Sequence, residues 1–141
     1  MIPNSKQSGQ SEAKGLHITQ AGPSLVKKFA YLDADTARKY DPQIAAIYYN
    51  QMMHHGKHHH QAVCTCATHL LDRIWTVLSE ERPYELRDVD GTAVTAAEAQ
   101  RIIAERYRVP AEVRRRNNQR QRRSRVEQQA EKKQKREKRP K

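Results

Sequence analysis

Three serines near the start of the chain carry the hydroxyl groups that could act as nucleophiles: Ser5, Ser8 and Ser11, with Lys6 and Lys14 among them. A free serine attacks poorly and needs a neighbouring base or a metal ion to activate it. The sequence contains no catalytic-triad, paired-carboxylate or glycine-rich phosphate-loop motif that would supply such help. Taken alone, the Ser8-Gly9 dipeptide therefore predicts a turn in a polar loop or short hairpin.

Six histidines and two cysteines crowd into residues 54–69 and suggest metal binding. On a helix, His55 and His59 would lie four residues apart, a spacing that can chelate zinc. Cys64 and Cys66 cannot both join that face, because positions two apart on a helix point about 200° away from each other. No Cys-x-x-Cys pair is present. We therefore expect no metal site in this chain, and no disulfide between two such close cysteines.

The positive charge of the chain lies almost entirely in its last segment. Residues 111–141 hold 14 Lys/Arg and 4 Asp/Glu, a net charge of +10 out of +11 for the whole chain. Such a surplus predicts a polyanionic partner, nucleic acid before an anionic membrane surface. Its phosphate contacts would be salt-dependent and blind to sequence. Without interleaved aromatic residues, base stacking is not indicated. The candidate contacts are Arg114, Arg115, Arg116, Arg122 and Arg123.

Apolar periodicity predicts the first two helices that would follow the serine segment. The first begins at Gly22-Pro23-Ser24, with Ser24 as a plausible cap. Its apolar stripe consists of Leu25, Val26, Phe29 and Leu32. The second begins with Asp41 as N-cap and Pro42 at the first helical position. Its stripe consists of Ile44, Ile47, Tyr48 and Met52.

Two further helices are predicted before Pro110. The third spans about His58 to Ser79. Its Trp75, like Tyr48 of the second helix, is expected in the core or in helix contacts. It has the strongest stripe: Val63, Ala67, Leu70, Leu71, Ile74, Trp75 and Leu78. A loop with a turn at Asp90-Gly91 follows. Thr95 and Glu98 then form a capping box that opens the fourth helix. Its inward residues are Ile102, Ile103 and Tyr107.

These elements predict an all-α protein in three parts. Residues 1–22 form a polar loop that carries Ser8-Gly9, residues 23–109 form a small domain of about four helices, and residues 110–141 form a basic tail. With no apolar face to bury, the tail is expected to be disordered or a solvent-exposed helix. No apolar run suits a membrane span and no signal peptide opens the chain, so we expect a cytoplasmic protein without a membrane partner.

Several of these residues also occur together in the signature of one protein family. In the first segment they are Pro3, Gln7-Ser8-Gly9, Gly15, Ile18-Thr19, Gly22 and Leu25-Val26-Lys27. Further on they are Gly56-Lys57, Ala62, Val63, Ala67, Leu70-Leu71 and Ile74. Over about residues 1–80 this pattern resembles the C-terminal domain of the DEDD-type insertion-sequence transposases. These are relatives of the Piv-type DNA invertase and are also known as bridge-RNA-guided recombinases.

The resemblance implies a catalytic role for Ser8, which matches the position of the family's nucleophilic serine. In the family that serine attacks a DNA phosphodiester. The four carboxylates that hold the divalent metal, expected to be Mg²⁺, belong to a separate RuvC-like domain. No cofactor is thus expected in this chain itself, and Lys6, Lys14 and Lys27 become candidate phosphate contacts.

The sequence departs from the family pattern in three places. Gln20 stands where a basic residue is usual, and Lys27 stands where an arginine is common. The spacing from Gly15 to Ile18 is one residue longer than in the family pattern. Lysine keeps the charge but loses the bidentate fork that arginine offers a phosphate. The resemblance also places Cys64 and Cys66 at positions of small packing residues.

Two functions follow as expectations. The first is the DNA-binding, serine-bearing C-terminal part of an insertion-sequence transposase, inactive alone because the RuvC-like domain is missing. Its partners would be DNA, a guide RNA, and a RuvC-like domain supplied in trans or further copies of the chain. The alternative is a non-enzymatic helical module that binds nucleic acid through its basic tail.

Overall fold

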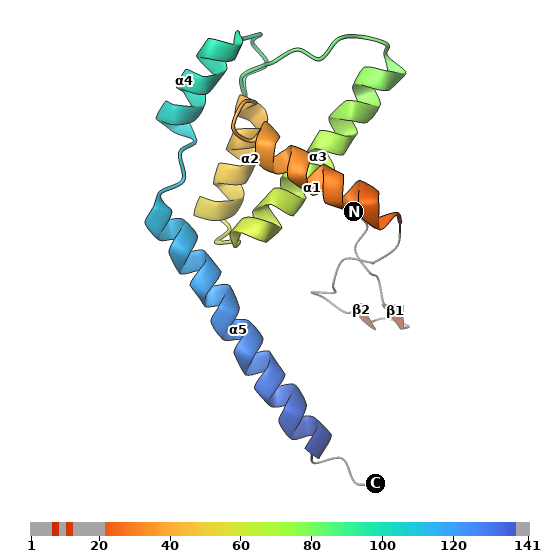
Figure 1. Cartoon of the computed structure of the whole chain (residues 1–141), viewed down its shortest axis with the longest axis vertical. Coiled ribbons are helices and arrows are strands. Elements are labelled where there is room, and N and C mark those ends of the chain that lie inside the picture. Colours follow the sequence, from red (N-terminus) through yellow and green to blue (C-terminus); the bar gives the residue numbers. More distant parts are fainter. Residues whose placement is uncertain (1–6, 9–10, 13–21, 138–141) are drawn as a thin grey trace.

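The computed structural model describes residues 7–8, 11–12 and 22–137 of the chain, and this part is all-α apart from one short strand pair (Figure 1). The elements are β1 (Gln7–Ser8), β2 (Ser11–Glu12), α1 (Ser24–Ala37), α2 (Pro42–Met53), α3 (His59–Ser79), α4 (Ala96–Arg106) and α5 (Ala111–Glu137). The prediction of an all-α fold is confirmed, and the basic tail supplies a fifth helix. None of the described helices has both the length and the apolar composition needed to cross a membrane.

Side-chain caps explain where α2 and α4 begin. The Asp41 carboxylate accepts hydrogen bonds from the backbone N–H groups of Gln43 (2.8 Å) and Ile44 (3.1 Å). Thr95 and Glu98 form the reciprocal capping box at the start of α4. Both predictions are confirmed, because each cap depends only on residues next to it in the chain. In contrast, the expected cap of α1 is wrong: Ser24 is already helical, and the N-cap residue is Pro23, whose side chain has no hydrogen-bonding group.

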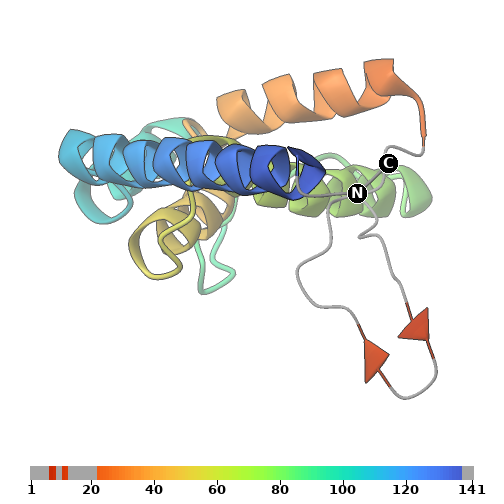
Figure 2. The ribbon, with the colours of Figure 1, turned by 90° about the horizontal axis from the view of Figure 1, so that it is seen from below.

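The core forms around α3, which packs against both α1 and α2 (Figures 1 and 2). From α2 it receives the buried residues Ile44, Tyr48 and Met52, as predicted. Its remaining buried members are small or medium-sized: Ala30, Ala34, Ala62, Val63, Cys66 and Ala67. Ala99 is the buried residue of α4, while the predicted inward residues Ile102, Ile103 and Tyr107 are half-buried. The core is therefore small and relies on close approach between helices.

The predicted apolar stripe of α1 lies on its exposed side. Leu25, Val26, Phe29 and Leu32 are all exposed, between 48% and 62%. The residues of α1 that are buried are Ala30 and Ala34, which belong to a different face of the helix. The expected orientation of α1 was wrong because small residues, which weigh little in a hydrophobic pattern, allow the closest approach of α1 to α3.

The stripe of α3 is buried over only part of its length. Val63 and Ala67 are fully buried, and Leu70 and Leu71 pack at the edge of the core. Beyond them Ile74, Trp75 and Leu78 are exposed, Trp75 to 73%, so the expectation that Trp75 belongs to the core or to a helix contact is not met. The C-terminal half of α3 thus extends past the helices that cover its first half (Figure 1).

The basic tail is a continuous helix that starts at the bundle and points away from it (Figure 1). Its early inward positions Val113, Asn117, Gln121 and Ser124 recur at helical spacing and are at least partly buried. The solvent-exposed helix expected for the tail is thus present, but its first turns also pack against the bundle. The attachment is made mainly by polar groups, which a search for apolar periodicity does not detect.

Candidate nucleic-acid interface

A buried asparagine attaches α5 to the bundle. The Asn117 side-chain amide donates hydrogen bonds to the carbonyl oxygens of Met52 (2.9 Å) and Lys57 (3.1 Å), and the residue is only 6% exposed. The next residue, Asn118, accepts a hydrogen bond from the backbone N–H of His59 (3.2 Å). These bonds satisfy the Met52 carbonyl at the end of α2 and the His59 N–H at the start of α3, where a helix lacks partners of its own, and the Lys57 carbonyl between the two helices. They also set the direction in which α5 leaves the bundle.

The arginines of α5 face solvent once the helix is attached in this way. All seven between residues 114 and 125 are exposed: Arg114, Arg115, Arg116, Arg120, Arg122, Arg123 and Arg125. None of them forms an ion pair with any residue that the structure describes. The sequence-predicted contacts Arg114, Arg115, Arg116, Arg122 and Arg123 thus lie together on one exposed helix. Their guanidinium groups are open to external anions.

Five arginines outside α5 differ, because acidic side chains pair with them. Arg38 contacts Asp35 (2.8 Å), Arg73 contacts Asp41 (2.7 Å), and Arg82 contacts Glu80. The same holds for Arg87 with Glu85 (2.8 Å) and for Arg106 with Asp88 (3.3 Å). Attraction for a polyanion is therefore concentrated on α5, as the near-neutral composition of residues 1–110 predicts.

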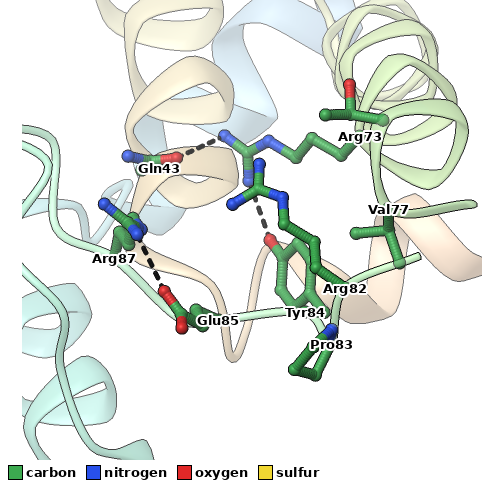
Figure 3. Close-up of a pocket in the computed structure, with 9 residues that line it drawn as sticks. Gln43, Arg73, Val77, Arg82, Pro83, Tyr84, Glu85 and Arg87 are labelled. Atoms are coloured by element: carbon green, nitrogen blue, oxygen red, sulfur yellow. Dashed lines mark hydrogen bonds and ion pairs between the residues drawn. The ribbon is translucent and has the colours of Figure 1, made fainter. Parts of the chain in front are cut away.

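In a small pocket beside α3, neighbouring side chains occupy the guanidinium group of Arg73 (Figure 3). Its volume is about 150 Å³. One Arg73 nitrogen donates to the carboxylate of Asp41 and to the hydroxyl of Tyr84 (3.0 Å), and the other donates to the Gln43 carbonyl oxygen (2.8 Å). The Tyr84 hydroxyl also donates to Asp41.

These contacts decide what the pocket can do. Burial raises the pKa of Tyr84, and its bond to the Asp41 carboxylate raises it further. Asp41 accepts hydrogen bonds from two backbone N–H groups, Arg73 and Tyr84, so both of its carboxylate oxygens are engaged within the protein. We read this network as a structural connection between α2, α3 and the loop after α3.

The histidine cluster is divided among different local roles. His55 precedes α3, which begins at His59, so the two do not share the helical face that zinc chelation would need. His59 Nδ1 is hydrogen-bonded to the Tyr48 hydroxyl (2.8 Å), and its Nε2 lies 3.6 Å from Asp35. The ring of His60 packs against Tyr31 with centroids 4.7 Å apart. Among the described residues, no three His, Cys, Asp or Glu side chains gather in a way that could hold a metal ion.

The two cysteines serve packing. Cys66 lies in the core and donates a long hydrogen bond from its sulfur to the Ile44 carbonyl (3.7 Å). Burial raises its pKa to about 12, so the thiol stays protonated at neutral pH. Cys64 is half-buried, and burial raises its pKa as well. Burial thus disfavours, at both sulfurs, the thiolate form that nucleophilic attack or metal binding requires.

The predicted catalytic and phosphate-binding residues of the first segment lie largely outside what the structure describes. Ser8 lies in β1, where its backbone pairs with that of Ser11, and its side chain is outside the described part of the structure. Lys6 and Lys14 lie outside the described residues altogether. Lys27 is on α1, which does not contact α5. The grouping of Ser8 with Lys6, Lys14 and Lys27 stays a prediction.

Asn117 and Asn118 are the functional residues that sequence reasoning missed. A signal was present, because Val113 and Asn117 are four residues apart in a run otherwise dominated by charge. Asparagine is uncommon inside helices unless its amide has a partner, which makes two consecutive asparagines in an arginine-rich helix informative.

Comparison with known proteins adds no assignment. No family model, no curated protein and no solved structure matches this chain. The resemblance to insertion-sequence transposases accordingly depends on the quoted sequence motifs alone.

Proposed function

We propose that this chain is a nucleic-acid-binding helical module whose main contact surface is the exposed side of α5. The observation that supports this most directly is the run of seven unpaired, exposed arginines on a helix that Asn117 holds in a defined direction. An arginine guanidinium offers planar, two-pronged hydrogen bonding to phosphate, which suits repeated backbone contacts.

The mode of binding follows from the residue types. Contacts between α5 and phosphates release counterions, so affinity should fall steeply as salt rises. Phosphate contacts position a protein on nucleic acid without reading its sequence. The described part of α5 contains no aromatic residue on which a base could stack. The helix therefore supplies affinity and orientation, and any sequence preference must arise elsewhere.

Salt-dependent binding of a fluorescent duplex tests this proposal. The combined variant Arg115→Gln/Arg122→Gln/Arg123→Gln should lower the slope of log affinity against log salt by about 3, one for each lost contact. The matched control removes three paired bundle arginines, Arg82→Gln/Arg87→Gln/Arg106→Gln, and should keep nearly the parent slope. Equal losses in both variants, or no binding by the parent chain at 50 mM salt, would refute the proposal.

A narrower form of this function is transposition, in which the nucleic acid is DNA and Ser8 is the nucleophile. It is supported by the motif around Ser8-Gly9 and not by any contact in the structure. It predicts residual, sequence-preferring DNA binding by the α5 triple variant that is lost when Lys6, Lys14 and Lys27 are changed to Gln. Complete loss of binding in the α5 variant favours the non-enzymatic module instead.

The same hypothesis predicts that the chain alone performs no strand exchange, because nothing in it replaces the RuvC-like carboxylates. A strand-transfer assay with the parent chain and Ser8→Ala examines this directly. Product formed by the parent and abolished in the Ser8→Ala variant would contradict the expected dependence on a second domain.

A further inference from the structure

A second basic site lies where α5 meets the bundle, on the side of α4. It is a cavity of about 340 Å³ bounded by residues that follow α1, by α2, and by the connection from α4 to α5. Four of its lining side chains are cationic: Arg38, Lys39, Arg108 and Arg114. The other lining residues include Tyr48 and Tyr107, and none is acidic. Residues from three separate segments of the chain thus bring positive charge to one hollow.

The charges in this cavity are only partly compensated. Asp35 pairs with Arg38 (2.8 Å) and, more weakly, with Lys39 (3.9 Å). Arg108 and Arg114 are exposed and form no ion pair with a described residue. Two guanidinium groups therefore face the cavity region without a partner, on either side of the start of α5.

The surroundings of the cavity are consistent with its positive charge. The Arg38 guanidinium lies over the Tyr48 ring, 4.5 Å from its centroid, and is thereby held at the cavity wall. Burial lowers the pKa of the neighbouring His59, and the charges of Arg38 and Arg114 lower it further against the opposite effect of Asp35. The first turn of α5 adds the positive end of a long helix dipole, next to which a cation such as Arg114 is unfavourable and an anion favourable.

We propose that this cavity binds a phosphate group, with Arg108 and Arg114 as its direct ligands and Arg38 and Lys39 as supporting charges. The identity of the ligand rests on the proposed function: the phosphate belongs to the nucleic acid that runs along α5. A phosphate bound at the start of α5 would determine where the nucleic-acid strand meets the bundle. The volume is at the lower end of small-ligand sites, enough for a phosphate with an attached sugar.

Small phosphate ligands test the site separately from α5. Titration calorimetry at low salt with inorganic phosphate and with a deoxynucleoside 5′-monophosphate should show binding to the parent chain. The variant Arg108→Gln/Arg114→Gln should weaken it by about tenfold or more, since two charge-assisted contacts are lost. The control Arg82→Gln/Arg87→Gln removes the same charge from paired bundle positions that do not line the cavity and should leave it unchanged.

The outcomes separate this site from the proposed function. If the α5 triple variant loses duplex binding but keeps the monophosphate, both proposals stand as distinct sites. If the monophosphate fails to bind, or if both double variants weaken it equally, the phosphate site is refuted whatever α5 does. Circular dichroism of each variant verifies folding, and Arg108→Lys/Arg114→Lys should restore part of the affinity by restoring charge.

Comparing the binding of single strands with and without a 5′-phosphate identifies the source of the phosphate. Stronger binding of the phosphorylated strand that depends on Arg108 and Arg114 identifies a strand end. Equal binding of the two strands that still falls in the Arg108→Gln/Arg114→Gln variant identifies a backbone phosphate. Strand binding that is indifferent to both the phosphate and the variant overturns the site.

Discussion

Asp41 illustrates how one side chain can join local and distant structure. One carboxylate oxygen caps α2 through the N–H groups of Gln43 and Ile44, and the other accepts from Arg73 and Tyr84. The residue is 4% exposed, so these partners replace water almost completely. The two roles use different atoms, which allows them to be separated by substitution.

Two variants of Asp41 should differ in their free energy of unfolding by the contribution of the helix cap. Asp41→Asn keeps a good capping oxygen but loses the charge that neutralises Arg73, so the free energy of unfolding should fall by about 1–3 kcal/mol. Asp41→Ala also loses the cap and should cost about 1 kcal/mol more. Urea denaturation of both variants, with exposed Asp72→Asn as control, measures the difference. Indistinguishable costs for the two Asp41 variants would show that the cap contributes nothing.

What the sequence predicts at this scale depends on distance along the chain. The caps at Asp41 and at Thr95–Glu98 were foreseeable because donor and acceptor are at most three residues apart. Arg73 and Tyr84 reach Asp41 from 32 and 43 residues away, and no local pattern indicates such a meeting. The same reason hid Arg38 as a neighbour of Arg114, since the cavity that both residues line is made by tertiary packing.

At the scale of elements, the contact between α1 and α3 depends on small side chains. Ala34 and Ala67 are completely buried, while Phe29 on α1 and Trp75 on α3 are exposed. Hydrophobic periodicity located both helices correctly but predicted the wrong buried face for α1. Periodicity weighs large apolar residues most, whereas the distance of closest approach between two helices is set by the residues at the crossing.

Enlarging a residue at this crossing should be more harmful than removing a large exposed one. Ala67→Leu forces extra atoms into a filled space and should lower the free energy of unfolding by about 1–3 kcal/mol. Trp75→Ala on the same helix should change it by about 0.5 kcal/mol or less, because its side chain is mostly in water. Thermal and urea unfolding compare the two. A larger loss for Trp75→Ala would mean that its face is covered in solution.

The attachment of α5 gives a second prediction for an element. Asn117→Leu fills similar space but leaves the carbonyls of Met52 and Lys57 without their donor, which should cost about 1–3 kcal/mol. Trypsin should also cut the released helix faster at its arginines. Gln119→Leu, two residues further along and exposed, is the matched control. Equal cleavage of the two variants would show that α5 keeps its position without the Asn117 bonds.

Considered as a whole, the molecule separates a bundle in which most arginines are paired from a basic helix whose exposed arginines are not. The net charge of +11 lies mostly outside the folded core, so self-repulsion acts chiefly along α5. The sequence predicted this division from composition, since charge totals need no knowledge of the fold. It did not predict that α5 and the bundle share a boundary where His58 and His59 lie near Arg125 and Arg114.

That boundary should make stability depend on pH. Burial lowers the pKa of His58 and His59 from the usual 6.5. The pKa of His58 is lowered further by His60, Arg125 and Lys57. The pKa of His59 is lowered further by Arg38 and Arg114, while Asp35 raises it. Below pH 6.5 the unfolded chain therefore binds protons that the folded chain resists, and stability falls as the pH falls.

The melting temperature, followed by circular dichroism from pH 7.5 to 5, should accordingly decrease toward the acid end. Burial by itself raises the pKa of Asp35, but its hydrogen bond and charge contact with Arg38 outweigh this and leave the pKa below 3.8, so that carboxylate does not titrate in the window. His59→Gln should make the decrease shallower, while His69→Gln on the exposed side of α3 should not. Because a bound phosphate would offset Arg38 and Arg114, inorganic phosphate should also flatten the profile of the parent chain. A melting temperature that rises on acidification would contradict the unfavourable protonation of these buried rings.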